Sequence, residues 1–407
     1  YNGIQSNRIA RLNADGTLDA TFNVGTGANL GISKVVILPN GKVIIGGDFT
    51  TFNNIAINRI ARLNSDGSLD TTFNTGGAGA NASVQSLAVQ ADGKILVGGG
   101  FYNFNGVAVT TPLVRLNANG TIDSSFNMGL GTDGGTVLGL AVQPDGKIIL
   151  VGGSSTFNNV VVGYIVRVNP NGSVDPTWNP GGTGANYFLY SVKLQADGKI
   201  LITGDFTSYN GQACRNFVRL NSNGTLDTTF NCTTLAGGPL NVSVIQNDGK
   251  YIIGGSCTPY NGFTGKGIMR LNTDGSLDTT LIQGTGFDTF VSDLALQPDG
   301  KIIVGGGFIS YNGVTRKYIT RLNGSAILGV NEFNSADKVS VYPNPVTDYL
   351  KFDLHENITA KSFEVYDVAG KKVHSGDLQE NQIDVSAYTS GIYFLHLKTA
   401  DGMLSAK

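Results

Sequence analysis

Short apolar runs alternate with Asn-Gly and Asp-Gly pairs along residues 1–323, and the two patterns together predict β-strands joined by tight turns. Asn-Gly and Asp-Gly supply the positive-φ positions that hairpin turns need. Each unit of the pattern has four such runs, and no stretch longer than a turn has the periodicity of a helix. We call the expected strands a, b, c and d in chain order; in one unit they are 84–90, 94–99, 113–117 and 121–126.

Three short anchors return in the same order and register, which shows that this part of the chain is a repeat with a period of 51 to 53 residues. An aromatic-Asn-(Gly/Asn) anchor runs from Tyr1-Asn2-Gly3 to Tyr311-Asn312-Gly313. An (Asp/Asn)-Gly-Lys anchor contributes Lys42, Lys94, Lys147, Lys199, Lys250 and Lys301. An Arg-apolar-Asn anchor contributes Arg11, Arg62, Arg115, Arg167, Arg219, Arg270 and Arg321.

Four-stranded units of about 50 residues cannot bury their faces alone, and they stack radially as blades. We therefore predict an all-β fold, a β-propeller of six or seven blades. A parallel β-solenoid is the competing architecture, but its coils are usually shorter and lack these hairpin turns. The chain opens on strands c and d of a blade. Either sequence upstream of Tyr1 supplies strands a and b and the ring has seven blades, which we favour, or six blades close with a terminal strand.

The repeated polar residues are interpreted as parts of the blade. A residue present in every unit serves the unit, so we expect the arginines to pair with repeated aspartates or with loop carbonyls between neighbouring blades. The turn that begins at Asn64 superficially is similar to a calcium loop, but Arg62 and Phe73 stand where its first acidic ligand and its last glutamate are required. We predict no metal site and no cofactor.

The repeat unit also resembles a known family. Leu-Asn-x-(Asp/Asn)-Gly-Ser-Leu-Asp-x-Thr-Phe-Asn, followed by Gln-x-Asp-Gly-Lys-Ile-(Ile/Leu)-x-Gly-Gly-x-Phe-x-x-Tyr-Asn-Gly, resembles the delta-60 β-propeller repeats of bacterial surface proteins. The resemblance covers residues 1–325, which we take as the propeller. Because that family has no single assigned activity, the resemblance implies a fold and leaves the function open.

The composition changes after Asn323. Residues 326–338 lack the repeat anchors and are interpreted as a linker, and residues 339–407 as a second domain. Residues 392–397 alternate between an apolar and a mixed side, as a half-buried strand does. Seven short strands predict a small immunoglobulin-like β-sandwich; they are 339–342, 349–354, 363–367, 372–377, 382–385, 392–398 and 403–406.

Four runs of this second domain carry a resemblance to a known family: 341–345, 365–371, 378–385 and 390–394. With these runs the domain closely resembles the type A sorting domain of the type IX secretion system. The resemblance implies export across the outer membrane of Bacteroidota-type bacteria and a secreted or cell-surface protein. It implies as partners the outer-membrane shuttle β-barrel, the translocon, and a surface sortase that cleaves in the segment 324–338. The residues matching the export motif are Tyr342, Pro343, Asn344, Pro345, Asp367, Gly370, Lys371, Gly391 and Tyr393.

Charge and composition exclude several function classes. The net charge of −2 leaves no basic surplus for nucleic acid, and no apolar run is long enough to span a bilayer. Tyr1 is not an initiator methionine, so the chain is interpreted as mature or partial. All three histidines lie after residue 354, and no glutamate precedes Glu332. Triad catalysis, histidine metal sites and glutamate acids or bases are therefore absent from the propeller sequence, and we predict a protein that is not an enzyme.

Recognition is expected where the blades differ, in the b–c and d–a loops, which emerge at one end of a propeller. Aromatic and acidic residues in the d–a loops suit glycan binding by stacking and hydrogen bonding. The alternative is that some of these aromatic side chains fill the core between blades. The candidate residues are Tyr187, Phe188, Tyr190, Phe287, Asp133 and Asp288.

The three cysteines map to the same end of the propeller. A Cys232–Cys257 disulfide or a Cys214–Cys232 disulfide suits an exported protein, and three unpaired thiols are the alternative. No CxxC spacing points to zinc or redox chemistry.

Two functions compete on the sequence. The first is a non-catalytic binding or adhesion protein of the cell surface, delivered by type IX secretion. The second is a secreted propeller hydrolase acting on glycans with an acid and a base drawn from aspartates alone, which requires two converging carboxylates. A third possibility is that the chain is a non-catalytic domain of a much larger protein, which is compatible with the first function.

Overall fold

The computed structural model describes residues 7–232, 237–257, 265–278, 280 and 284–323, and then 339–343, 345–354, 359–367, 371–378, 380–399 and 402–406. The chain divides into two compact units, residues 1–326 and 327–407. Strands and turns make up the described residues, which contain no helix. Accordingly, no helix suited to crossing a membrane occurs among them. The predicted linker 326–338, with Asn344 and Gly370, lies outside the described residues.

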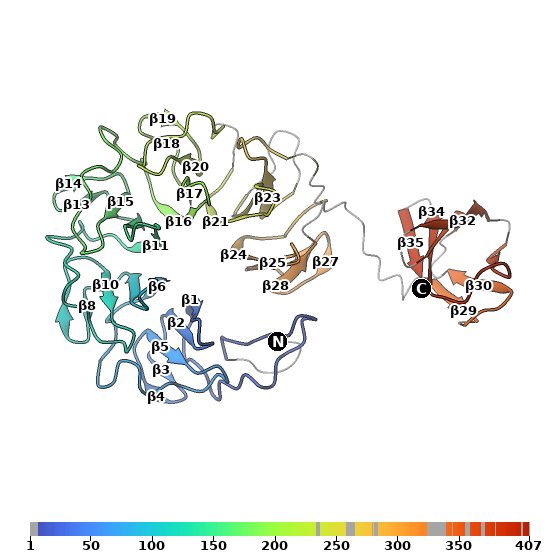
Figure 1. Ribbon diagram of the computed structural model, residues 1–407, viewed down its shortest axis with the longest axis horizontal. Helices are drawn as coiled ribbons and strands as arrows, with labels where there is room; N and C mark the ends of the chain where they lie inside the picture. Colours follow the sequence, from blue (N-terminus) through green and yellow to red (C-terminus); the bar gives the residue numbers. More distant parts are fainter. Residues whose placement is uncertain are drawn as a thin grey trace. The chain divides into compact units, whose positions relative to one another are not determined.

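Within its described residues, the first unit holds six three-stranded antiparallel sheets arranged around a centre (Figure 1). Each sheet pairs strand a with b and strand b with c, as the sequence pattern predicts. The sheets are β1 (Ile32–Ile37), β2 (Val43–Gly47) and β5 (Ile60–Leu63); β6 (Val84–Val89), β7 (Ile95–Gly99) and β10 (Leu113–Leu116); β11 (Val137–Val142), β12 (Ile148–Gly152) and β15 (Ile165–Val168); β16 (Leu189–Leu194), β17 (Ile200–Gly204) and β20 (Phe217–Leu220); β21 (Leu240–Ile245), β22 (Tyr251–Gly255) and β23 (Ile268–Leu271); and β24 (Val291–Leu296), β25 (Ile302–Gly306) and β28 (Ile319–Leu322).

Strand d is shorter than predicted, because it is reduced to one isolated bridge. In the first complete blade Leu63 bridges Leu69, and the chain then turns at Asp70. The Asp70 carboxylate accepts hydrogen bonds from the backbone N–H and the hydroxyl of Thr72, at 3.0 and 2.6 Å. This Asx turn bends the backbone away from strand c, so the repeated Asp-x-(Thr/Ser) ends the outer strand after one pair.

The connection from strand b to strand c contains a small hairpin that the sequence pattern did not predict. Its turn is the aromatic-Asn-(Gly/Asn) anchor, and Asn53 and Asn54 both have positive φ, as a type I′ turn requires. The hairpins are β3 (Thr51–Phe52) with β4 (Ile55–Ala56), β8 (Asn103–Phe104) with β9 (Val107–Ala108), β13 (Thr156–Phe157) with β14 (Val160–Val161), β18 (Ser208–Tyr209) with β19 (Gln212–Ala213), and β26 (Ser310–Tyr311) with β27 (Val314–Thr315).

The repeated arginine joins each blade to the next. Arg219 donates its Nε to Asp227 at 2.7 Å, lies 4.7 Å over the ring of Phe230, and donates through a terminal nitrogen to the Thr273 carbonyl of the following blade at 2.6 Å. Lys199, from the start of strand b, reaches the same Asp227 oxygen at 2.7 Å. This Arg–Asp–Lys triad recurs from blade to blade, with aspartates Asp70, Asp123, Asp175, Asp227 and Asp278.

The same contact connects the last blade to the first residues of the chain. Arg321 of β28 donates to the carbonyl of Ala14, just as Arg11 donates to Ser65 and Arg62 to Ala118. The N-terminal segment, in which Leu12 bridges Leu18, therefore stands in the ring between the β24–β25–β28 sheet and the β1–β2–β5 sheet.

A disulfide joins Cys214, at the end of a b–c hairpin, to Cys232 in the following d–a loop, with Cα atoms 4.8 Å apart. The predicted pairing of Cys232 with Cys257 is wrong, because Cys257 is a free, buried cysteine. Cys257 occupies the position after strand b at which other blades place a buried phenylalanine, such as Phe206 or Phe308. Its thiol therefore faces the core, and burial raises its pKa to about 12.

Removing this disulfide is expected to lower the stability of the propeller. Replacing both Cys214 and Cys232 with alanine frees a loop with a sequence separation of 18 residues. Closing a loop of similar size is worth about 3 kcal/mol. Denaturant unfolding should show a loss of about that size, and a reductant should destabilise the wild type but not the double variant. Cys257→Ala is the matched control, and a reductant response that requires Cys257 would contradict the assigned pairing.

The second unit is a sandwich of two antiparallel sheets. Phe352, Phe363, Ile383 and Leu397 are buried in the core between them. One sheet has β30 (Tyr349–Leu354) between β29 (Val339–Tyr342) and β33 (Gln382–Asp384); the other has the order β32 (Lys372–Asp377), β31 (Ala360–Asp367), β34 (Tyr393–Thr399) and β35 (Gly402–Ala406).

Candidate functional site

The b–c hairpins and d–a loops pack against each other in a regular way, so most of this end of the propeller is built by the repeat. Ala28 bridges Phe52, and Ala185 bridges Tyr209 in the same manner three blades later. The next residue along, Asn29, accepts hydrogen bonds from the backbone N–H groups of Thr50 and Thr51 at 2.8 and 3.0 Å. The corresponding residues of other blades are Asn81, Asp133, Asn186 and Asp288.

Asp133 and Asp288 therefore occupy a position of the repeat at which other blades have asparagine. Asp133 accepts a hydrogen bond from the Ser155 hydroxyl at 2.7 Å, and Asp288 accepts from the backbone N–H of Ile309 at 3.0 Å. Desolvation by burial raises the pKa of each carboxyl group, but hydrogen bonds from the b–c hairpin outweigh it and leave both pKa values lowered. The two carboxylates hold loops in place, as the asparagines of other blades do.

Phe287 is likewise part of the core. It is 1% exposed and packs on Phe308 and Tyr311, with ring centroids 4.4 and 4.6 Å away. The ring of Phe287 is therefore not available for recognition at the surface. Tyr190, in β16, is half-buried, and desolvation by burial raises the pKa of its hydroxyl.

Tyr187 and Phe188 lie together at the surface of the propeller, and Tyr164 packs against both. The rings of Tyr187 and Phe188 are stacked, with centroids 4.6 Å apart and planes inclined by 19°. Tyr164 lies across both rings, with centroids 6.3 Å from Tyr187 and 5.7 Å from Phe188. Tyr187 is 47% exposed. We call Tyr164, Tyr187 and Phe188 the aromatic cluster.

Tyr164 was not among the residues singled out from the sequence. It precedes strand c at a backbone position with a φ of 66°, and the same position has positive φ in other blades. Its side chain varies where the surrounding anchors repeat, which is the signal that identifies the position from the sequence alone. The equivalent residues are Arg8, Arg59, Asn216 and Tyr318.

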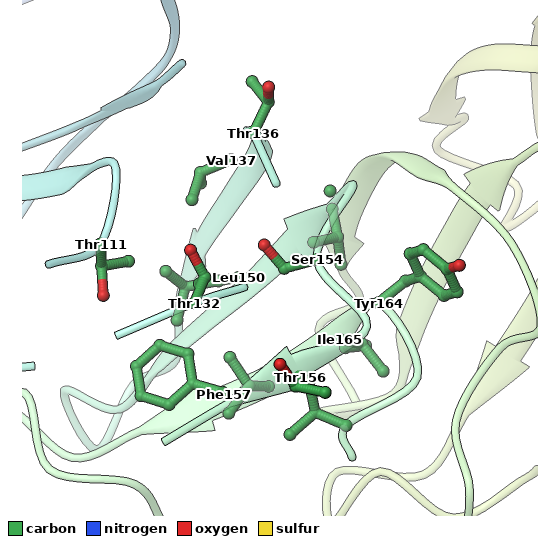
Figure 2. A pocket seen from close by; sticks show the side chains of 14 residues that line it. Thr111, Thr132, Thr136, Val137, Leu150, Ser154, Thr156, Phe157, Tyr164 and Ile165 are labelled. Carbon is green, nitrogen blue, oxygen red and sulfur yellow. The ribbon is translucent and has the colours of Figure 1, made fainter. Parts of the chain in front are cut away.

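A small cavity lies beneath this part of the propeller (Figure 2). It exists because Ser154 stands where other blades place a core phenylalanine such as Phe101. The cavity measures about 20 Å³, and the buried hydroxyl oxygens of Thr111, Thr132 and Ser154 along its wall have no hydrogen-bond partner among the described residues. A space of this size suits a single water molecule and is too small for an organic ligand. A ligand of the propeller is therefore expected to bind at the surface and not in this cavity.

The buried carboxylates form ion pairs within the blades. Among the described residues, the buried aspartates are those of the Arg–Asp–Lys triads. Desolvation by burial raises their pKa, but ion pairs with lysine and arginine and hydrogen bonds from Thr or Ser outweigh it, and the pKa of each remains well below its usual range. Such groups stay ionised at neutral pH and do not serve as general acids. The described residues also contain no His, Cys, Asp and Glu group suited to a metal ion.

In the second unit, residues of the export motif line a groove of about 640 Å³ between the two sheets. Pro345 comes to this groove from one segment and Gly391 and Tyr393 from another, beside Val346 and the half-exposed Ile392. The Tyr393 hydroxyl donates to the Thr389 carbonyl at 2.9 Å, which holds the segment before β34.

The other motif residues that the structure describes are not part of the groove lining. The Tyr342 hydroxyl donates to Asp353 at 3.0 Å, and the Tyr342–Pro343 peptide bond is cis. The Asp367 carboxylate accepts from the backbone N–H of Lys371 at 2.9 Å, at the turn from β31 to β32. The structure therefore brings part of the motif together around the groove and uses another part to close a turn.

Sequence profiles of two families match the chain. One is described as a secretion system C-terminal sorting domain and matches residues 340–407. The other is described as a domain of unknown function (DUF5122) β-propeller and matches 1–22, 38–73, 90–126, 143–177, 195–230, 246–281 and 297–325.

Fold and profiles together define the class, an exported β-propeller protein with a sorting domain. Because the propeller profile covers more than half of its length, the chain belongs to the DUF5122 β-propeller family. Its sorting domain marks it for export by the type IX secretion system, to the cell surface or into the medium.

Solved structures give more distant likenesses. The chain is similar to PorZ, a surface component of the type-IX secretion system of Porphyromonas gingivalis, with 13% identity, a TM-score of 0.39, and 92% of this chain and 58% of that chain covered. It is similar to the extracellular domain of a two-component system from B. thetaiotaomicron (10% identity, TM-score 0.46, 92% and 54% covered). It is also similar to virginiamycin B lyase from Staphylococcus aureus, with 14% identity, a TM-score of 0.44, and 72% of this chain and 85% of that chain covered.

The chain spans little more than half the length of the first two proteins. None of the three likenesses bears on activity. No curated protein sequence matches the chain.

Proposed function

We propose that this protein is a non-catalytic binding protein of the bacterial surface, which recognises glycans through the aromatic cluster. The observation that carries the proposal is the stacked pair Tyr187–Phe188 with Tyr164 across it. Flat, exposed aromatic faces bind the apolar faces of sugar rings, and their rigid side chains lose little entropy on binding. The cluster rests on rigid strands, because Phe188 directly precedes β16 and Tyr164 directly precedes β15.

The state of the acidic residues supports a binding role over catalysis. The buried aspartates are held in ion pairs, and Asp133 and Asp288 hold the b–c hairpins. A hydrolase needs one carboxyl group with a raised pKa beside one that is ionised. The carboxyl groups discussed above have lowered pKa values instead.

A glycan array with the full chain tests the proposal. Tyr187→Ala is expected to weaken binding by about 2 kcal/mol, or about thirtyfold, because alanine removes the exposed member of the stacked pair. Tyr102→Ala is the matched control, since Tyr102 is an exposed tyrosine of a neighbouring b–c connection, 38% exposed. Both variants should unfold at the temperature of the wild type. Absence of glycan binding, or equal losses in the two variants, would contradict the proposal.

For delivery, we propose that the groove in the second unit docks onto the type IX machinery, namely its outer-membrane shuttle β-barrel and translocon. A surface sortase then cleaves between residues 324 and 338. The support is that Pro345, Gly391 and Tyr393 of the export motif meet at this groove, beside exposed apolar side chains such as Ile392. Exposed apolar surface of this kind marks protein interaction sites.

A further inference from the structure

The blade that contains Tyr187 and Phe188 also contains a carboxylate without a partner in the chain. Asp205 directly follows β17, and its backbone N–H donates to the Phe188 carbonyl at 2.8 Å. Its side chain is half-buried, and it forms no hydrogen bond or ion pair with any residue that the structure describes. The aspartates of the Arg–Asp–Lys triads are neutralised by two cations, whereas the charge of Asp205 is available to a ligand.

Comparison with the first complete blade explains why this carboxylate is free. Asp48 is the equivalent residue there, since its backbone N–H donates to the Gly31 carbonyl at 2.8 Å in the same way. The Asp48 carboxylate accepts a hydrogen bond from the hydroxyl of Ser83, the last residue before β6 of the next blade. The residue that corresponds to Ser83 for Asp205 is Pro239, directly before β21. Proline has neither a hydroxyl nor a backbone N–H, so it donates no hydrogen bond.

The same comparison places the stacked aromatic pair beside the free carboxylate. Phe188 stands where Gly31 stands in the first complete blade, and Tyr187 stands where Leu30 stands. A Cβ atom added at Gly31 would have as its nearest neighbour a carboxylate oxygen of Asp48, 3.9 Å away. A side chain at this position of the repeat therefore begins next to the carboxylate of its own blade. One blade thus combines an exposed aromatic pair with a free acid.

Tyr190 gives a second indication that the carboxylate acts on this surface. Burial raises the pKa of the Tyr190 hydroxyl, and the charges of Asp205 and Tyr187 raise it further. Such an effect requires these groups to lie near one another. The loop segments 153–164 and 179–188, which carry the aromatic cluster, contain no charged residue. In the segment 205–216, Arg215 is the other charged residue, and it forms no ion pair with Asp205.

We propose that the aromatic cluster and Asp205 together bind an amino sugar whose amine is unacetylated and positively charged. This inference rests on the proposed function and names the class of glycan. The apolar face of the sugar ring stacks on Tyr187, and the ammonium group pairs with the Asp205 carboxylate. A hydrogen bond between two charged groups is about twice as strong as one between neutral groups, and aromatic faces also attract cations. An acidic sugar is disfavoured at the same place, because its charge repels the carboxylate.

Binding of two matched oligosaccharides to the full chain tests the inference. A β-linked glucosamine oligosaccharide and its N-acetylated counterpart have the same length and linkage, but only the first carries ammonium groups. The first is expected to bind about tenfold more tightly, or better, because only it forms the ion pair. Asp205→Asn should lower the affinity for the first to that for the second and leave the second nearly unchanged. Titration calorimetry measures all four affinities.

Asp48→Asn is the matched control, because it removes the same charge at the equivalent position of a blade that has leucine and glycine in place of the aromatic pair. It should leave both affinities unchanged. Tyr187→Ala should weaken both oligosaccharides by a similar factor, since stacking does not require the amine. The unfolding temperature of Asp205→Asn should equal that of the wild type, because no described residue pairs with this carboxylate. A clear drop would assign Asp205 a structural role and overturn the inference.

Other results would overturn the inference and leave the proposed function standing. Equal affinities of the wild type for the two oligosaccharides, both weakened by Tyr187→Ala, would show glycan binding that ignores the amine. Equal losses for both oligosaccharides in Asp205→Asn would show that the carboxylate binds sugar hydroxyls. Equal losses in Asp205→Asn and Asp48→Asn would show a general effect of net charge. If neither oligosaccharide binds, the inference fails, and the glycan array described above decides separately whether the protein binds other glycans.

Discussion

Asp227→Asn should destabilise the propeller by about 3–5 kcal/mol, because it leaves the Arg219 guanidinium buried without its counter-ion. The Arg219 side chain is 9% exposed, and its Nε lies 2.7 Å from the Asp227 carboxylate. Lys199 is 30% exposed and can turn to solvent, so the cost arises mainly at the arginine. Asparagine has the same shape as aspartate and keeps a hydrogen-bond acceptor for Thr229. The substitution therefore measures the effect of the charge alone. Denaturant unfolding of both proteins measures the difference.

Asp197→Asn is the matched control in the same blade. Asp197 is exposed in the turn between β16 and β17, where it accepts from the backbone N–H of Lys199 at 3.0 Å. Asparagine preserves that acceptor, so the control should cost less than about 0.5 kcal/mol. Equal losses in the two variants would show that the triad is no more important than a surface turn.

The same ion pair gives a pH signature. Burial raises the pKa of Asp227, but the hydrogen bonds from Lys199, Thr229 and Arg219 outweigh it, and the net pKa is lowered from its ordinary value of 3.8. The unfolded chain therefore binds the proton more readily than the folded one, and stability is present above pH 4 and falls as the pH drops below it. Asp227→Asn should flatten that acid limb relative to the wild type. If the loss of stability below pH 4 were unchanged in the variant, other carboxyl groups would be responsible for the acid sensitivity.

The blades were predictable because their signals are local and recur. Strands a, b and c follow from apolar runs between Asp-Gly and Asn-Gly turns, and the structure pairs them in that order. Strand d was overestimated because its alternation is real, but Asp70 and Thr72 turn the backbone after one bridge. The b–c hairpin was missed because two-residue strands are too short to show periodicity.

The loop residues were harder, because their roles depend on equivalence between blades. Asp133 looked distinctive as an acid, yet its neighbours in the repeat carry asparagine at the same capping position. Phe287 was a candidate as an aromatic residue of a d–a loop, but it stands where Ala28 stands in another blade and is buried like it. Tyr187 and Phe188 were found because the d–a loop that contains them is rich in aromatic residues.

Removing residues 339–407 should abolish surface display and trap the propeller in the periplasm. The sorting domain forms its own core around Phe352, Phe363 and Leu397, and the chain divides between residues 326 and 327, so the propeller does not need it to fold. Cell fractionation with surface proteolysis measures where the truncated protein resides. Its unfolding temperature should match that of the propeller transition of the full chain, which separates failed export from misfolding. Normal surface display of the truncated protein would refute the export role.

Point variants test whether the groove is the part of the domain that the machinery recognises. Ile392→Asp places a charge on the groove wall at a side chain that is 50% exposed, so the fold should tolerate it while docking of an apolar partner is lost. Lys398→Asp, at an exposed position of β34, the strand that begins directly after Ile392, is the matched control. Surface display should fall to background for the first variant and remain normal for the second. Equal display of the two variants would move the recognition surface away from the groove, to the segment around Tyr342 or the turn at Asp367.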